Sequence, residues 1–233
     1  MRLQVFLSIS GIASRRNAAS IITSGKVSVN GIKIFEPSFK VDPEKDKVFL
    51  YDERIAPREK VYVVLNKPKG VTTTKKDVFA EKTVIDLLPR ALKHLNPVGR
   101  LDKDTTGLLL LTNDGDLINR LTHPKFNIEK TYLVALNRRL SANDKIQVEN
   151  GISLDGRMTA RCNIVLKRGN DLEITMHEGR KRQIKRMFAL KGYSVVNLKR
   201  LKEGMLSLGR LVEGEWRFLN KEEVRLLISN CSN

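Results

Sequence analysis

Residues that build metal centres and redox sites are scarce in this sequence of 233 residues. It holds two cysteines, Cys162 and Cys231, which lie far apart and fit no metal-ligand or redox spacing. Its three histidines, His94, His123 and His177, are scattered rather than clustered. We therefore expect no metal site and no cofactor, and we interpret the cysteines as ordinary thiols of a cytoplasmic protein.

Long apolar runs are absent as well. No stretch approaches the roughly 18 consecutive apolar residues that a membrane-spanning helix needs. The chain begins with an amphipathic pattern and shows neither a signal peptide nor a transit segment. Apolar residues still make up 41% of the chain, which is enough for a buried core. We therefore expect a cytoplasmic protein with a packed core and no membrane partner.

Acidic residues are few compared with basic ones. The chain has 26 Asp and Glu against 43 Lys and Arg, and its formal net charge is +17. This charge indicates a polyanionic partner, and nucleic acid is the usual one. Residues 180–202 contain nine bases and no acid. Ile184, Met187, Phe188 and Leu190 interleave with these bases, which favours a helix packed on one side with phosphate-binding cations on the other. A simple solvated helix face is the alternative.

Residues 1–45 have the pattern of a compact unit of two helices and a hairpin. Ser14 is a suitable N-cap for a helix that ends at Gly25. Two short alternating stretches then flank Asn30-Gly31, a dipeptide typical of a type I′ hairpin turn. We expect residues 46–59 to contain the last strand of this unit, followed by a charged linker.

Residues 60–233 predict a larger unit in which strands and helices are mixed without regular βαβ alternation. Strands are expected at residues 61–65, 108–112, 132–136 and 172–176, and helices at residues 116–121, 182–190 and 221–228. The expected fold class is therefore α+β, with a small domain in front of a larger one.

The stretch from Gly99 to Gly107 reads Gly-Arg-Leu-Asp-Lys-Asp-Thr-Thr-Gly and is the most informative in the chain. It places Asp102 just before an apolar run, where a carboxylate is most simply a turn or capping residue. Asp102 and Asp104 also match the start of a calcium loop, but the twelfth position is Asn113 instead of a glutamate. A magnesium-dependent hydrolase that uses both aspartates is a further alternative, which activity in EDTA would exclude.

The same stretch is one of four that resemble, in the right order, the motifs of RNA pseudouridine synthases of the RsuA/RluB/RluE/RluF type. The other three are Asn66-Lys-Pro-Lys-Gly70, Lys130-Thr-Tyr-Leu-Val134 and Glu178-Gly-Arg-Lys-Arg-Gln-Ile-Lys-Arg-Met-Phe188. In front of them, Gly11-Ile-Ala-Ser-Arg-Arg-Asn17 and Gly25-Lys-Val-Ser-Val-Asn-Gly31 are similar to an S4 RNA-binding domain. The resemblance covers nearly the whole chain. It implies a small S4-like domain followed by a larger catalytic domain with a mixed antiparallel sheet.

The resemblance implies an isomerase that converts uridine in RNA to pseudouridine without metal or cofactor. Asp102 takes the position of the nucleophile and Tyr132 that of the active-site tyrosine. Arg100 takes the position of the arginine that fills the space of the flipped-out base or holds its phosphate. A cation is expected opposite Asp102, and Lys185 takes that position with Arg186 as the alternative. Whether Asp102 attacks C1′ or the uracil ring stays open.

Basic and polar residues of both parts are predicted to bind the surrounding RNA: Arg2, Arg15, Arg16, Lys26, Arg180, Arg182, Gln183 and Arg186. The stretch that contains Arg15 and Arg16 resembles the large-subunit members of the family. We therefore expect a site in 23S rRNA as the substrate and a monomer as the active form. The alternatives are 16S rRNA, tRNA, and a non-catalytic ribosome-assembly factor of the S4 type.

Overall fold

The computed structural model describes residues 1–75 and 81–229. The chain divides into two compact units. One comprises Met1–Lys60 together with Asn113–Gly115, and the other comprises Val61–Thr112 and Asp116–Asn233. Within the described ranges, no helix is both long enough and apolar enough to cross a membrane.

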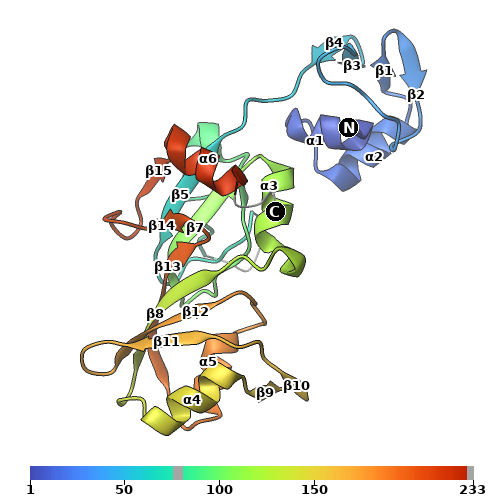
Figure 1. Ribbon diagram of the computed structural model, residues 1–233. Coiled ribbons are helices and arrows are strands. Elements are labelled where there is room, and N and C mark those ends of the chain that lie inside the picture. The colour runs from blue at the N-terminus through green and yellow to red at the C-terminus, as the bar shows by residue number, and fades with distance from the viewer. Residues whose placement is uncertain (76–80, 230–233) are drawn as a thin grey trace. The chain divides into compact units, whose positions relative to one another are not determined.

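The small unit consists of two helices and a four-stranded sheet (Figure 1). In chain order its elements are α1 (Leu3–Ile9), α2 (Arg15–Thr23), β1 (Val27–Val29), β2 (Ile32–Ile34), β3 (Val48–Leu50) and β4 (Glu53–Ile55). The Oγ atom of Ser14 accepts a hydrogen bond from the N–H of Asn17, 3.3 Å away, and so caps α2. Asn30 and Gly31 join β1 to β2 with φ angles of 51° and 85°, the left-handed values of a type I′ turn. The predicted helix and hairpin are confirmed.

The chain after residue 45 forms two strands instead of one strand and a linker. β3 pairs antiparallel with β1, and β4 pairs antiparallel with β3, so the strand order is β2–β1–β3–β4. Val48 of β3 is buried in the same core as Phe6 and Val27. Arg54, part of the charged stretch that suggested a linker, is exposed on the edge strand β4. Charged side chains are common at such edges because they discourage pairing with other chains.

The larger unit is built around a nine-stranded sheet. The remaining elements are, in chain order, β5 (Tyr62–Lys67), η1 (Arg90–Leu92), β6 (Asn96–Pro97), β7 (Thr106–Thr112), α3 (Gly115–Thr122), η2 (Pro124–Phe126), β8 (Lys130–Leu136), α4 (Ala142–Asn150), β9 (Ser153–Leu154), β10 (Arg157–Met158), β11 (Asn163–Leu166), β12 (Asp171–Met176), α5 (Gln183–Ala189), β13 (Val195–Glu203), β14 (Leu206–Ser207), β15 (Trp216–Phe218) and α6 (Lys221–Ser229). The strands and helices predicted for this unit all form, with ends shifted by at most two residues.

The sheet has two halves that meet at β13 and β7. Its main path runs β11–β12–β8–β13–β7–β5–β15, with β6 beside β7 and β14 beside β13. The pairs along this path are antiparallel except β13 with β7, which are parallel over two residue pairs. Gly107 lies opposite Arg200 at this junction, where a Cβ atom on Gly107 would come within 2.3 Å of the Arg200 carbonyl oxygen. The junction therefore depends on glycine. The mixed sheet confirms the α+β class.

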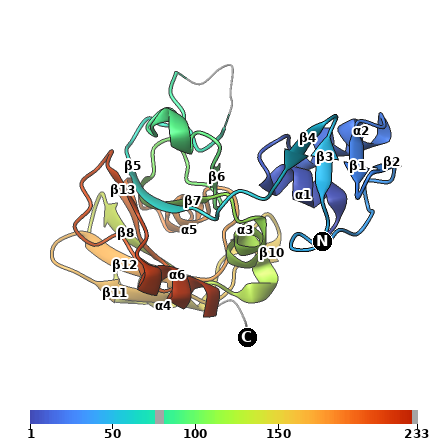
Figure 2. The same ribbon diagram turned by 90° about the horizontal axis from the view of Figure 1, so that it is seen from above.

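The apolar run in β7 is continuous because both faces of this strand are covered. Leu108 and Leu110 pack in one core with residues of α3 and α6, whereas Leu109 and Leu111 pack in another core with the segment between β5 and β6. Figure 2 shows α3 and α6 on one side of β5 and β7, and the described part of that segment on the other. Because successive side chains of a strand point to opposite faces, a strand buried on both faces has no polar alternation.

The half of the sheet that contains β8 and β12 is covered by α4 and α5. Val148 of α4 and Met187 and Phe188 of α5 pack against Val134 and Ile174 in one buried cluster. Of the interleaved apolar residues predicted to anchor the basic helix, Ile184, Met187 and Phe188 are therefore in the core. Leu190 is exposed instead, because it caps the end of α5.

The half-buried thiol of Cys162 packs against the cluster that α4 and α5 cover. Burial raises the pKa of this thiol to about 11, which favours the unreactive protonated form. Cys231 lies outside the described residues.

Candidate active site

Asp102 lies in the loop between β6 and β7, whose backbone is held by neighbouring side chains. Thr73 Oγ1 donates to the carbonyl of Leu101 at 2.8 Å and accepts from the N–H of Leu101 at 3.3 Å. The N–H of Thr105 donates to the Asp102 carbonyl at 3.0 Å and closes a turn. Leu101 is buried in the core below, while the side chain of Asp102 lines the cavity described below. The loop thus presents one fixed carboxylate to that cavity.

Lys67, at the end of β5, supports the same loop and was not among the predicted site residues. Its side chain is completely buried, and Nζ donates to the carbonyls of Lys103 and Thr105 at 3.3 and 2.8 Å. Burial lowers the pKa of Lys67 to about 8, and the carboxylates of Asp104 and Asp102 oppose this shift. Lys67 belongs to the motif Asn66–Gly70, which drew attention to it in the sequence. The residues around it, however, do not indicate that its side chain contacts a loop 36 residues further along the chain.

Tyr132 reaches the site from β8. Its side chain is half-buried and packs against two of the apolar cores. Ile174 lies opposite it on β12, and Arg200 lies opposite it on β13. Burial raises the pKa of Tyr132, whereas the positive charge of Arg200 opposes that rise. The phenol is therefore protonated at neutral pH, and its proton is available for transfer.

A cavity of about 600 Å³ brings six of the predicted residues together, namely Arg100, Asp102, Tyr132, Arg180, Arg182 and Gln183. Met176, Ile184 and Leu198 supply apolar wall. The volume lies within the range of small-molecule sites, roughly 300–1,000 Å³. Glu178, which is paired with Arg180, also lines the cavity. The carboxylate of Asp102, the phenol of Tyr132 and several cations around an apolar surface suit a flat ring attached to an anionic backbone.

Lys185 was predicted to lie opposite Asp102, but the ion pair that it forms is with a neighbouring carboxylate. Its ammonium forms an ion pair with Asp104, and the hydrogen bond from Lys185 lowers the pKa of that carboxyl. The alternative residue, Arg186, pairs with Asp155 at 2.5 Å. The side chain of Asp104 is 47% exposed at the outer end of the loop, where it meets the start of α5. The cation of the last motif therefore holds the loop through Asp104.

A metal site is not assembled at these aspartates. In residues 1–75 and 81–229, no group of three or more His, Cys, Asp or Glu side chains is arranged to hold a metal ion.

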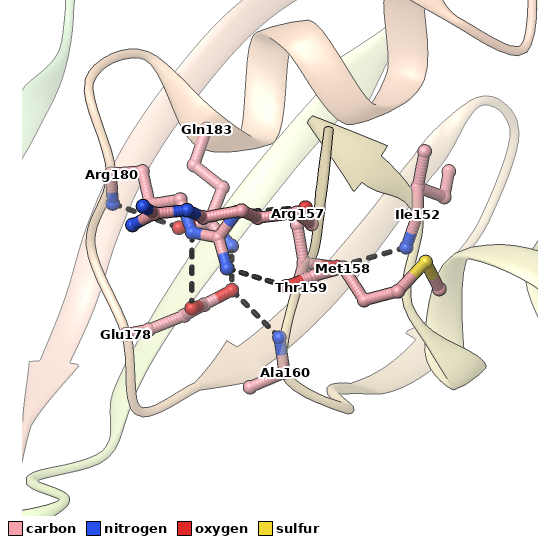
Figure 3. A network of polar contacts seen from close by, with 8 residues as sticks. All are labelled: Ile152, Arg157, Met158, Thr159, Ala160, Glu178, Arg180 and Gln183. Atoms are coloured by element: carbon pink, nitrogen blue, oxygen red, sulfur yellow. Dashed lines mark hydrogen bonds and ion pairs between the residues drawn. The ribbon is translucent and has the colours of Figure 1, made fainter. Parts of the chain in front are cut away.

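Arg180 and Gln183 are both engaged within the chain (Figure 3). The Arg180 guanidinium donates to the carbonyls of Arg157 and Met158 at 2.9 and 2.5 Å, and its Nε pairs with Glu178 at 3.4 Å. The amide oxygen of Gln183 accepts from the N–H of Arg180 at 2.8 Å, and its nitrogen donates to Glu178. These bonds tie the loop before α5 to the hairpin β9–β10 and shape the rim of the cavity. RNA contacts by these two residues remain a prediction.

The four bases predicted in the small unit are exposed. Arg2 precedes α1, Arg15 and Arg16 form the first turn of α2, and Lys26 follows the end of α2. The ammonium of Lys26 lies 5.7 Å from the centre of the Tyr51 ring. An exposed cation beside an aromatic ring fits RNA binding, and this role also remains a prediction.

Comparisons with known proteins agree over almost the whole chain. The model of a family described as RNA pseudouridylate synthase matches residues 61–190, and the S4 domain model matches residues 1–48. The ribosomal large subunit pseudouridine synthase B of Bacillus subtilis is 38% identical over 97% of this chain and 95% of its own. An uncharacterized RNA pseudouridine synthase of Aquifex aeolicus is 39% identical, over 97% and 93%. A crystal structure of a pseudouridylate synthase matches with a TM-score of 0.72 at 35% identity, over 97% and 99%.

Proposed function

Because this chain belongs to the RNA pseudouridylate synthase family and carries an S4 domain, we propose that it isomerises a specific uridine of 23S rRNA with Asp102 as the nucleophile. Pseudouridine synthase activity on RNA follows from the family itself. The observation that carries the finer proposal is the cavity that Asp102 and Tyr132 line together. The relative named for the large ribosomal subunit, and the Arg15-Arg16 stretch, support 23S rRNA as the substrate.

The uridine must leave its stack before it can meet Asp102, because the reacting atoms are inaccessible inside folded RNA. Extracting a base costs a few kcal/mol. Arg100 is exposed at the wall of the cavity and can fill the vacated space or hold the phosphate. The apolar side chains of Met176 and Leu198 then cover the uracil ring and exclude water.

The reaction breaks the N1–C1′ bond and forms a C5–C1′ bond, so that C5 loses a proton and N1 gains one. Asp102 forms a covalent bond with the nucleotide and thereby divides the exchange into two steps. Tyr132 lines the same cavity, and its phenol gives its proton to N1 and then, as the phenolate, takes up the proton that leaves C5. Lys185 acts on Asp102 indirectly, by holding the loop at Asp104. Lys67 holds the same loop from its buried side.

The surrounding RNA is bound by cations on both units. Lys181 and Arg182 are exposed beside the cavity, and Arg15, Arg16 and Lys26 are exposed on the S4 domain. Contacts of this kind read the backbone and shape of double-stranded RNA. One chain supplies all residues of the cavity, so we propose a monomer that works in the cytoplasm.

The test is pseudouridine mapping of rRNA from cells with and without this gene, by carbodiimide labelling and primer extension. We expect one modified uridine of 23S rRNA to disappear with the gene and to return with the wild-type copy. If a modified uridine disappeared from 16S rRNA or tRNA instead, the proposed activity would hold but the proposed substrate would be wrong. An unchanged set of pseudouridines in all three RNAs would contradict the proposed function.

A further inference from the structure

Arg200 and Glu203 form an ion pair that is almost completely removed from solvent. Each side chain is 2% exposed, and Nη2 of Arg200 lies 3.1 Å from Oε2 of Glu203. A second bond joins Nη1 to Oε1 at 3.3 Å. The Nε–H of Arg200 donates to the carbonyl of Leu108 at 2.7 Å. The reaction as described above uses neither of these two charged residues.

The pair lies where the strands of the two proposed reacting groups meet. Arg200 is on β13, between β8 and β7. It lies opposite Tyr132 of β8 on one side and opposite Gly107 of β7, a few residues beyond Asp102, on the other. Residues directly opposite each other on neighbouring strands project from the same face of a sheet. The guanidinium is therefore a neighbour of the Tyr132 side chain, behind the wall of the cavity.

Packing alone does not call for charges at this place. A buried ion pair is often no more stabilising than apolar side chains of similar size, because both ions lose their hydration. The surroundings of the pair are apolar on the side of β7, where Leu108 and Leu110 are completely buried. We therefore expect the buried charge of Arg200 to act on a neighbouring group.

We propose that Arg200, held in place by Glu203, is a positioning residue that directs the phenol of Tyr132 into the cavity and keeps its proton transferable. This inference rests on the proposed function, because it assigns Tyr132 the proton transfer. The fork of the guanidinium bonds Glu203 and Leu108 at once, so its orientation is fixed from two strands. Replacing Arg200 by lysine keeps the charge but loses this fork.

The electrostatics give the two members of the pair opposite effects on Tyr132. The positive charge of Arg200 lowers the pKa of the Tyr132 phenol, whereas the negative charge of Glu203 raises it. Asp102 raises it as well, and burial raises it most. The other cation beside the pair, Lys130 of β8, donates to the carbonyl of Ile128 at 3.1 Å and lies opposite Glu203.

The first experiment measures the Tyr132 titration by tyrosinate absorbance, with Tyr132→Phe as the blank for the other tyrosines. We expect Glu203→Gln to move this titration to lower pH, because Arg200 is left without its counter-charge. We expect Arg200→Gln to move it to higher pH, because the cation is lost and the carboxylate remains. Shifts in the same direction, or no shift in either variant, would overturn the proposal. This titration requires no turnover, so its result is independent of the proposed function.

The second experiment measures single-turnover rates on a 23S rRNA transcript and the affinity for it. The variant Arg200→Met/Glu203→Leu replaces both charges with apolar side chains, which is expected to preserve folding. We expect its rate to fall about tenfold or more with unchanged RNA affinity. In a protein that already carries Tyr132→Phe, the replacement of Arg200 and Glu203 is expected to change the rate by about twofold or less. The pair is proposed to act through the Tyr132 phenol, which this background lacks.

An equal loss of rate in both backgrounds, or a wild-type rate in the apolar double variant, would contradict positioning through Tyr132. If the double variant loses its cooperative unfolding transition, the single-turnover rate of Glu203→Gln is measured in the wild-type and Tyr132→Phe backgrounds instead. We again expect a smaller change of rate in the Tyr132→Phe background. Failure of the proposed function would be visible separately, as a wild-type protein that forms no pseudouridine in the transcript.

Discussion

Lys67 and Arg200 are the two buried cationic residues in the described part of the chain, and both lie beside the proposed active site. Each is compensated by oxygen atoms of neighbouring strands and loops, since an isolated buried charge is too costly to keep. Lys67 uses backbone carbonyls of the Asp102 loop, whereas Arg200 uses Glu203 and the carbonyl of Leu108. At the scale of single residues, the site is held by these buried cations.

The buried lysine makes stability depend on pH in a definite direction. The pKa of Lys67 is about 8 in the folded chain and 10.5 when unperturbed, so between these values the unfolded chain holds more proton. The contribution of Lys67 to the free energy of unfolding is therefore lowest below pH 8 and rises toward pH 10.5. The full rise is about 3 kcal/mol, at about 1.4 kcal/mol for each pKa unit.

The rise is measured as the difference in unfolding free energy between wild type and Lys67→Met across this pH range. Lys103→Met, an exposed position on the same loop, is the control and is expected to follow the wild type. If the unfolding free energies of wild type and Lys67→Met changed with pH in parallel, the buried ammonium would not be the titrating group.

The critical contact between elements is the short parallel pairing of β7 with β13. It joins the half of the sheet that follows Asp102 to the half that contains Tyr132, over the pairs Thr106–Lys199 and Gly107–Arg200. The geometry of the two proposed reacting groups therefore depends on how closely these strands approach.

Gly107→Ala is expected to separate the two strands. The φ angle of Gly107 is +103°, and a Cβ there would lie 2.3 Å from the Arg200 carbonyl oxygen. We expect the free energy of unfolding to fall by about 3 kcal/mol or more, through backbone strain and the clash together. Gly156→Ala is the matched control, because its φ is +75° but no atom lies within 4 Å of the added Cβ. The control is expected to cost about 1 kcal/mol. Equal losses in denaturant titrations of the two variants would argue against a tight junction.

The elements that the sequence predicted well are those with local signals. Ser14 and Asn30-Gly31 mark a cap and a turn within a few residues, and the apolar run in β7 marks a strand covered on both faces. The parallel pairing of β13 with β7 has no local signal, because the Arg200 guanidinium and the Leu108 carbonyl are 92 residues apart.

For the same reason the sequence did not reveal the pairing partners of the charged residues. Motif order placed Lys185 opposite Asp102, but its ammonium meets Asp104, two residues further along the same loop. Motif order can identify a loop and a helix that lie together, but not which of two carboxylates on one loop meets the cation. The tie between Arg180 and the hairpin β9–β10 is likewise a long-range contact, over 22 and 23 residues.

At the scale of the whole molecule, a net charge of +17 provides the general attraction to RNA. The S4 domain carries exposed bases of its own, and its core of α1, α2, β1 and β3 is separate from the cores of the catalytic unit. We therefore expect the two units to contribute different properties: RNA affinity from the small one and turnover from the large one.

Removal of residues 1–60 is expected to weaken binding to 23S rRNA at least about tenfold while the remaining chain keeps a cooperative unfolding transition. The salt dependence of binding should become shallower, because fewer phosphates are neutralised. Filter binding at several salt concentrations, together with thermal unfolding, measures both effects. A fragment with the same affinity and the same salt dependence would show that the S4 domain has another task.

The most direct test of Asp102 as the nucleophile is single-turnover pseudouridine formation on a 23S rRNA transcript by Asp102→Asn beside Asp104→Asn. We predict that Asp102→Asn forms no pseudouridine although it binds the transcript with nearly wild-type affinity. Asp104→Asn, which removes the ion pair with Lys185 but leaves the nucleophile in place, is predicted to react more slowly but still to form pseudouridine, and to be insensitive to EDTA. Substantial turnover by Asp102→Asn, or loss of both activities together with inhibition of the wild type by EDTA, would contradict Asp102 as the nucleophile.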